Sequence, residues 1–173
     1  YSLIELHYFL KKLFYYEEDL YYKIKSLICY KFKTNEELKT AVKLYSDEDT
    51  KNDAIKHYNI ISLWDVSKIT DMSYLFFHPY DKNNDDDPLT YLDFEGGGTK
   101  YCAVNFNENI NNWDVSNVTN MRHMFWRARN FNRPLNDWDV SNVTNMSGMF
   151  DAASFDQPLN NWDVSNVTDM RGM

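Results

Sequence analysis

A nine-residue pattern occurs four times in this chain and constrains its fold more than any other feature. The pattern W-D-V-S-x-[IV]-T-[DN]-M stands at residues 64–72, 113–121, 138–146 and 162–170. The last three tryptophans are 25 and 24 residues apart. A unit of this length cannot bury its apolar side chains alone, so neighbouring units must stack on one another. The repeat therefore predicts an elongated array of coils.

The apolar residues of each unit follow a fixed register. Tryptophan and valine, two residues apart, share one face of an extended segment, and the later steps of three and four residues fit one side of a helical turn. We therefore expect a short strand and then a helical turn in each repeat, with Thr119, Thr144 and Thr168 as N-caps. The expected repeat core comprises Trp64, Trp113, Trp138, Trp162, Val115, Val140, Val164, Met121, Met146 and Met170.

The chain before the repeats has helical spacing of its apolar residues. Leucines and isoleucines within residues 1–28 recur every three to four positions. Residues 34–37, T-N-E-E, predict a capping box. The helix that follows it should bury Leu38, Ala41, Val42 and Tyr45, and a further short helix is expected around residues 54–58. These helices would cover the exposed end of the repeat core.

We therefore predict two domains. An α-helical N-terminal region and cap occupies residues 1–59, and the repeat array occupies residues 60–173 with an incomplete last repeat. An acidic insertion at about residues 78–104 interrupts the array.

The net charge of −8 belongs to the repeat part of the chain. Residues 1–60 carry 10 basic and 10 acidic side chains, whereas residues 61–173 carry 8 basic and 16 acidic ones. A nucleic-acid footprint needs a net basic surface, so nucleic acid is not an expected partner. Two cysteines and four histidines also make a disulfide framework or a cysteine-based zinc site implausible. No uncharged apolar run approaches the roughly 20 residues that span a bilayer.

The pattern W-D-V-S-x-V-T-x-M-x-x-M-F, followed by F-N-x-x-L-x-x-W, resembles the repeat of the BspA-type leucine-rich-repeat surface proteins. That repeat is also found in mycoplasma lipoproteins and in proteins of protists, algae and large DNA viruses. The resemblance covers residues 60–76 and 106–173. It implies an α+β solenoid of leucine-rich-repeat-like units of 24–25 residues, used for adhesion or protein binding, with no catalytic residues. It favours the cell surface, the extracellular space or a virion as location, with the cytoplasm as the alternative.

The identical polar residues of the repeats have two interpretations. Asp65, Asp114, Asp139 and Asp163 would form a column that holds a cation or a basic partner, or each would accept backbone hydrogen bonds in an Asx turn. Their identity in every copy favours the turn. Asparagines that begin N-V-T, at Asn117, Asn142 and Asn166, are either glycosylation sites or a ladder that satisfies the backbone, and their regular recurrence favours the ladder.

The acidic insertion contains a weak calcium-binding motif. Asp81, Asn83, Asp85 and Asp87 alternate like the start of an EF-hand loop. The sixth position is Asp86 instead of glycine, and the twelfth is Leu92 instead of glutamate. A solvated acidic loop is therefore the favoured interpretation, and no metal or cofactor is expected elsewhere.

One repeat differs from the others in its charge. It carries Arg122, Arg127, Arg129 and Arg133, with Trp126 among them. Tryptophan and arginine are enriched in the energetic centres of protein interfaces, so these residues are candidates for partner binding. The alternative is that the arginines pair with carboxylates of neighbouring coils.

No catalytic triad, phosphate-binding glycine loop or paired-histidine motif is present in the sequence, so we do not expect an enzyme. The expected function is that of a surface- or particle-associated scaffold that binds protein, including further copies of the chain in a larger assembly. One alternative is an intracellular adaptor, because residues 18–27 faintly resemble an F-box helix. Another is a calcium-dependent adhesion module.

Overall fold

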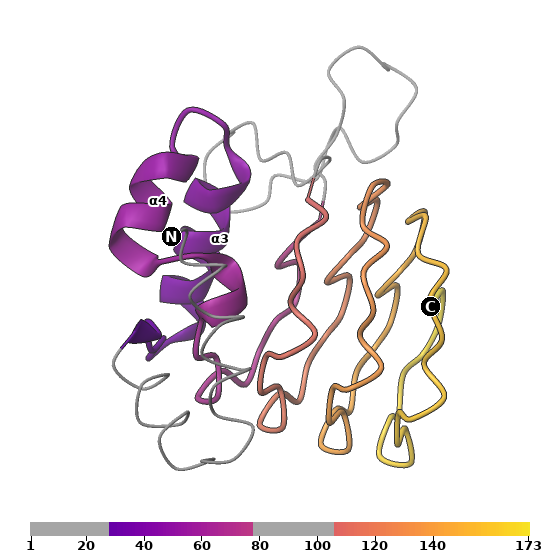
Figure 1. The fold of residues 1–173 in the computed structure, drawn as a ribbon. Coiled ribbons are helices and arrows are strands. Elements are labelled where there is room, and N and C mark those ends of the chain that lie inside the picture. Colours follow the sequence, from indigo (N-terminus) through magenta and orange to yellow (C-terminus); the bar gives the residue numbers. More distant parts are fainter. Residues whose placement is uncertain (1–27, 78–105) are drawn as a thin grey trace, which may run out of the picture.

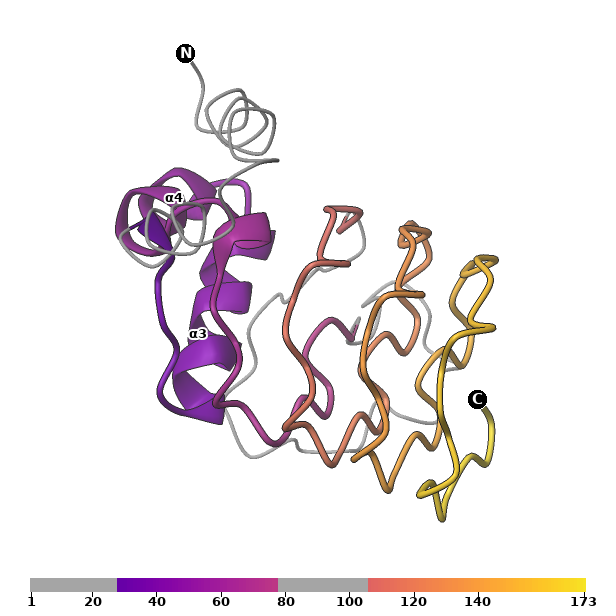
Figure 2. The ribbon, with the colours of Figure 1, turned by 60° about the horizontal axis from the view of Figure 1, so that its bottom comes forward.

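The computed structural model describes residues 28–77 and 106–173. At one end lie α3 (Asn35–Ser46) and α4 (Lys51–Tyr58), followed by the short 3-10 helix η1 (Ile61–Leu63). The repeats form coils that lie side by side in chain order and lead away from these helices (Figure 1, Figure 2). We number the coils one to four by their tryptophans, Trp64, Trp113, Trp138 and Trp162. The helices expected before residue 28 and the insertion at 78–104 lie outside the described residues.

The predicted capping box begins α3. The Thr34 hydroxyl accepts a hydrogen bond from the backbone N–H of Glu37, 3.1 Å away, which satisfies one of the free N–H groups of the first turn. The four apolar residues predicted on the inner face of this helix are all buried, which confirms that face. The Tyr45 ring packs against the Trp64 indole with a centroid distance of 5.6 Å. The helix therefore covers the core at the first coil.

A short segment before α3 pairs with coil one. Lys31 and Asp65 form a parallel bridge. The backbone N–H of Phe32 donates to the Asp65 carbonyl over 3.0 Å, and the Asp65 N–H donates to the Tyr30 carbonyl over 2.9 Å. This pairing satisfies backbone groups of the first coil that would otherwise lie at an open edge.

Parallel bridges also join the coils to one another. They link Asp71 to Asn120, Asn120 to Asn145 and Asn145 to Asp169. The methionine that follows each of the first three bridge residues donates its N–H to the next coil, for example from Met121 to the Asn145 carbonyl over 2.8 Å. The coils are thus held in register by main-chain hydrogen bonds.

No strand forms within residues 28–77 and 106–173, where each bridge stays isolated. In the bridges between coils, a left-handed residue stands three positions after each bridge residue. This position is taken by Tyr74, His123, Gly148 and Gly172, with φ angles of 59°, 52°, 61° and 67°. A left-handed residue ends extended geometry, so the ladder cannot lengthen into a strand.

The strand and the helical turn expected in each repeat are absent from the described coils. Tandem turns replace the strand at the tryptophan: the Trp113 N–H donates to the Ile110 carbonyl over 3.0 Å, and the Val118 N–H donates to the Val115 carbonyl over 2.8 Å. The three threonines are also not helix N-caps. Their hydroxyls instead donate to a threonine carbonyl one coil earlier, over 3.2, 3.1 and 3.0 Å for Thr119, Thr144 and Thr168.

A single apolar core runs from α3 to coil four. Within it the rings stack from coil to coil, with centroid distances of 5.2 Å between Phe76 and Phe125 and 5.6 Å between Phe125 and Phe150. All residues of the expected repeat core are buried except Val164 and Met170, which are 36% and 43% exposed. Both lie on the last described coil, which has a neighbouring coil on one side only (Figure 1).

Candidate functional site

The residues that are identical in every coil are occupied in holding the stack together. The indole N–H of each later tryptophan donates to a carbonyl of the preceding coil: Trp113 to Ile61 over 2.9 Å, and Trp138 to Ile110 over 3.0 Å. These bonds satisfy carbonyl groups in the buried core, where an unpaired polar group is costly. The tryptophan that recurs in each repeat therefore serves the fold.

The asparagines of the N-V-T triplets form the expected ladder. The side-chain amides of Asn117, Asn142 and Asn166 donate to serine carbonyls of the preceding coil over 2.7, 2.8 and 2.7 Å. Each amide nitrogen is thus already engaged in a contact between coils.

The aspartate column consists of Asx turns, which confirms the favoured interpretation. The Oδ1 atom of Asp139 accepts from the Ser141 N–H over 3.1 Å and from the Ser141 hydroxyl over 2.6 Å, and the same pair of bonds recurs at Asp65 and Asp114. The hydroxyl bond and the N–H bond lower the pKa of Asp139 below its usual value. At Asp163 the backbone N–H of Ser165 contributes most to the same effect.

Metal ligands do not gather in the part of the chain that the structure describes. Within it, no group of three or more histidine, cysteine or acidic side chains could hold a metal ion. The calcium-motif residues, Asp81, Asn83, Asp85 and Asp87, lie outside that part. Among the helices of residues 28–77 and 106–173, none has the length and apolar content that crossing a bilayer requires.

The structure brings three of the five partner-binding candidates together. Arg122, Trp126 and Arg127 lie in one cluster, whereas Arg133 lies apart, with its Nε donating to the Asn107 carbonyl over 2.7 Å. Arg129 is exposed and no described contact links its side chain to the cluster. The other members of the cluster, which the sequence interpretation missed, are Tyr74, Phe77 and His123. We call these six residues the aromatic-arginine cluster.

The residues that the sequence interpretation missed occupy equivalent positions in adjacent coils. Phe77 and Trp126 occupy the same position in coils one and two, and the third coil has Asp151 there. Tyr74 and His123 likewise share a position that holds Gly148 in coil three. Comparing the variable positions of adjacent coils would have identified the cluster.

The rings of the cluster pack as a continuous surface across two coils. Phe77 stacks on Trp126 with a centroid distance of 6.5 Å and an interplanar angle of 9°. The His123 ring lies between Tyr74 and Trp126, at 5.1 and 5.2 Å. None of these rings is fully buried. They therefore present apolar area that a partner could cover.

Two guanidinium groups lie over these rings. Arg122 is 5.9 Å from the centroid of the Tyr74 ring, and Arg127 is 5.0 Å from that of the Trp126 ring. Both distances fall within the range of cation–π attraction. Stacking of this kind restrains a long side chain before any ligand arrives.

The glycine of the next coil leaves the space that the His123 ring occupies. A Cβ atom on Gly148 would overlap the imidazole ring of His123. Burial lowers the pKa of His123 below its usual value, and the neighbouring charge of Arg122 lowers it further, while Asp151 opposes this effect. Burial and Arg122 thus favour the neutral imidazole, against a backbone hydrogen bond of Gly148 that favours the charged one.

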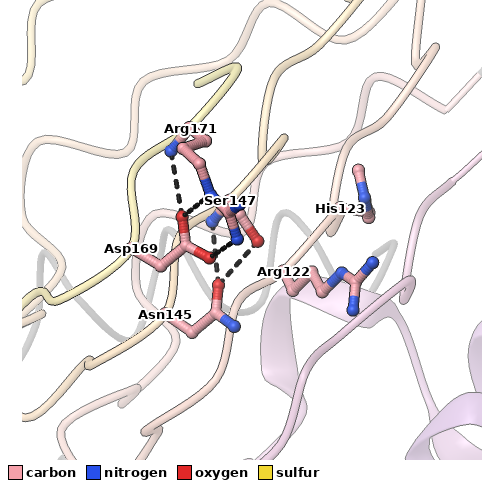
Figure 3. A pocket seen from close by; sticks show the side chains of 6 residues that line it. All are labelled: Arg122, His123, Asn145, Ser147, Asp169 and Arg171. Atoms are coloured by element: carbon pink, nitrogen blue, oxygen red, sulfur yellow. Dashed lines mark hydrogen bonds and ion pairs between the residues drawn. The ribbon is translucent and has the colours of Figure 1, made fainter.

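A polar groove of about 340 Å³ adjoins the cluster and is lined by residues of coils two, three and four: Arg122, His123, Asn145, Ser147, Asp169 and Arg171. Figure 3 shows Asn145, Ser147, Asp169 and Arg171 on one side of this groove and Arg122 and His123 on the other. The groove and the cluster share Arg122 and His123, so they form one continuous surface.

The charges of the groove differ in how they are paired. Arg171 binds Asp169 through Nε and Nη2, over 3.0 and 2.8 Å. These bonds lower the pKa of Asp169 to about 2, so this carboxylate is ionised and its charge is compensated. Arg122 makes no hydrogen bond or ion pair through its guanidinium group with the residues that the structure describes. It is thus the cation of the groove that remains available to a ligand.

Comparison with known proteins relates the chain to one family. The family model described as "Mycoplasma protein of unknown function, DUF285" matches residues 40–87 and 99–173. The search of curated proteins found no match, and neither did the search of solved structures.

Proposed function

The chain belongs to the family described as "Mycoplasma protein of unknown function, DUF285", and we propose that it is a non-enzymatic scaffold that binds a protein partner through its coils. In this proposal the coils are BspA-type leucine-rich repeats that form a solenoid, closed at one end by α3 and α4. The protein would act at a cell surface, in the extracellular space or on a virion.

The observation that carries the proposal is the contrast between repeated and variable positions. The repeated tryptophans, asparagines and threonines donate to the preceding coil, so their side chains hold the stack together. The variable positions of coils one and two instead supply a surface of aromatic rings with two arginines over them. A surface that the fold does not require is the expected place for a partner.

The composition of this surface suits a protein partner. Tryptophan, tyrosine and arginine are the residue types most enriched among the interface positions that contribute most to affinity. The rings of Trp126 and Tyr74 are also held by neighbours, so little side-chain freedom is lost on binding. Both properties favour recognition of a folded or extended protein segment.

Site-specific photo-crosslinking tests this function. Trp126 is replaced by benzoylphenylalanine in the full chain, which is expressed in its source cells and irradiated. Asn160, which is exposed on coil four, receives the same replacement as the control. We expect a discrete protein adduct at position 126 that is absent at position 160 and is lost when Arg122→Glu is added. Equal adducts at both positions, or none at position 126, would contradict the proposal.

A further inference from the structure

We propose that the groove and the aromatic-arginine cluster together recognise an acidic peptide segment, whose carboxylate binds Arg122 and Asn145 while an adjacent apolar side chain covers Trp126 and Phe77. This inference rests on the proposed protein-binding function and defines the chemistry of the partner. It follows from which donors remain free, which charges are paired and where the rings lie.

Two hydrogen-bond donors serve this carboxylate. The guanidinium of Arg122 is exposed and unpaired within residues 28–77 and 106–173, and its stacking on Tyr74 restrains it. The Oδ1 atom of Asn145 accepts from the N–H and the hydroxyl of Ser147 over 2.9 and 2.8 Å, which fixes the orientation of the amide. Its Nδ2 atom has no acceptor among the described residues and lies on the side of Asn145 that faces Arg122 (Figure 3). An arginine and an amide donor that line the same groove supply the kinds of hydrogen-bond donor that a carboxylate accepts.

The other charged residues of the groove do not favour a basic peptide. Asp169 would repel an acidic ligand, but its charge is compensated by the two bonds from Arg171. The residues that line the groove therefore keep the net positive charge of Arg122. A basic peptide would gain no free carboxylate in this groove.

A short acidic segment fits this surface better than a long polyanion does. The chain has a net charge of −8, and the exposed Asp114, Asp139 and Asp163 recur along the coils. Nucleic acid or a sulfated polysaccharide would extend past the arginines and meet this negative field. A peptide with one or two carboxylates beside an apolar residue would use Arg122 and the rings without that repulsion.

Fluorescence polarisation with defined peptides tests the inference on the full chain. The probe is a fluorescein-labelled peptide with the sequence Glu-Asp-Phe-Asp-Glu, and its comparison is the peptide with Gln and Asn at the acidic positions. We expect binding of the acidic peptide that weakens as salt rises, and at least tenfold weaker binding of the neutral one. Heparin and a single-stranded oligonucleotide are measured alongside.

A matched pair of variants distinguishes the effect of a local contact on peptide binding from the effect of net charge. Arg122→Gln and Arg133→Gln change the net charge equally, but Arg133 lies outside the groove and the cluster. We expect Arg122→Gln and Asn145→Ala to weaken peptide binding about tenfold and about threefold, and Arg133→Gln to change it less than twofold. Both arginines are exposed, so unchanged melting temperatures will show that the variants fold.

Several outcomes would overturn the inference. These are absence of peptide binding up to millimolar concentration, equal binding of the neutral peptide, equal losses for Arg122→Gln and Arg133→Gln, and tighter binding of heparin or the oligonucleotide than of the peptide. If a protein adduct still forms at position 126 in the crosslinking experiment, protein binding stands and the acidic partner alone is refuted. If neither experiment shows binding, both proposals fail.

Discussion

The Oδ1 atom of Asn35 lies 3.3 Å from the backbone nitrogen of Thr70 and accepts its hydrogen bond. In the later coils the equivalent N–H donates to a threonine carbonyl of the preceding coil, as Thr144 does to Thr119 over 2.8 Å. Asn35 also accepts from the N–H of Asp71 over 3.4 Å, just as the Thr119 carbonyl accepts from Asn145. A side chain of α3 thus replaces the carbonyl of an absent preceding coil.

This replacement predicts the effect of Asn35→Ala. The change removes the acceptor of two backbone N–H groups, while alanine remains a good residue for the first turn of a helix. We expect the free energy of unfolding to fall by about 1 kcal/mol in urea denaturation. Asn160→Ala, at an exposed position without a described hydrogen bond, is the control and should change it by less than about 0.5 kcal/mol. Equal effects of the two changes would contradict the role of Asn35.

The indole N–H groups of Trp113, Trp138 and Trp162 each donate to a carbonyl of the preceding coil, and we call these bonds the indole ladder. The indole ladder predicts different costs for the same substitution at two tryptophans. Trp138→Phe leaves the buried carbonyl of Ile110 without its donor and should lower the free energy of unfolding by about 1–3 kcal/mol. Trp126 is only partly buried and lies outside the ladder, so Trp126→Phe should cost about 0.5 kcal/mol or less. Chemical denaturation of both variants measures the difference. A cost for Trp126→Phe as large as that for Trp138→Phe would be inconsistent with the ladder.

The sequence predicted which side chains enter the core better than it predicted the backbone between them. The fixed register places Trp113, Val115 and Met121 inside, because stacking leaves no other way to bury them. The sequence favoured Asx turns at Asp114 and its equivalents, but it also predicted a strand there. The strand does not form, because these side chains bind the local backbone and compete with strand pairing.

The left-handed residues could be predicted only in part. Gly148 and Gly172 signal such a position, but Tyr74 and His123 hold it in coils one and two, where residues with a Cβ give a much weaker signal than glycine does. The aromatic-arginine cluster was missed for a related reason. Its members lie 49 residues apart in sequence at one register position, as Phe77 and Trp126 do, and only stacking makes them neighbours.

The Asx turns predict that calcium removal leaves the coils unchanged. Each carboxylate of the column already accepts hydrogen bonds from its serine, so no cation is needed to offset their repulsion. We expect the same melting temperature in calcium and in chelator by differential scanning fluorimetry. A fall in chelator that Asp139→Asn abolishes would contradict this interpretation. A fall that Asp85→Asn abolishes would instead assign calcium to the insertion.

The lowered pKa of His123 predicts a loss of stability at mildly acidic pH. The unfolded chain takes up this proton at about pH 6.5, whereas the folded chain does so at a lower pH because burial and Arg122 disfavour the charged ring. The unfolded state therefore binds more protons between these two pKa values, and stability falls as pH drops below about 6.5. We expect His123→Asn to reduce the difference in the free energy of unfolding between pH 8 and pH 5. Equal differences in the two proteins would show that His123 does not contribute.

The contact between Gly148 and His123 predicts a non-additive pair of substitutions. Gly148 and Gly172 both have left-handed φ angles, of 61° and 67°, so alanine is strained at either site. At Gly172 the new Cβ would meet no atom closer than 4.0 Å, and the cost should be about 1 kcal/mol. At Gly148 the Cβ would also overlap the His123 ring, which should raise the cost to about 3 kcal/mol.

The double variant His123→Ala/Gly148→Ala isolates that overlap. Without the imidazole, Gly148→Ala should cost about as much as Gly172→Ala does, which gives a coupling energy of at least about 1 kcal/mol between positions 123 and 148. Urea denaturation of the four proteins of this cycle measures the coupling. Additive effects would mean that His123 moves away freely. In that case Gly148 would not be what holds the ring between Tyr74 and Trp126, and the cluster would have to owe its arrangement to stacking alone.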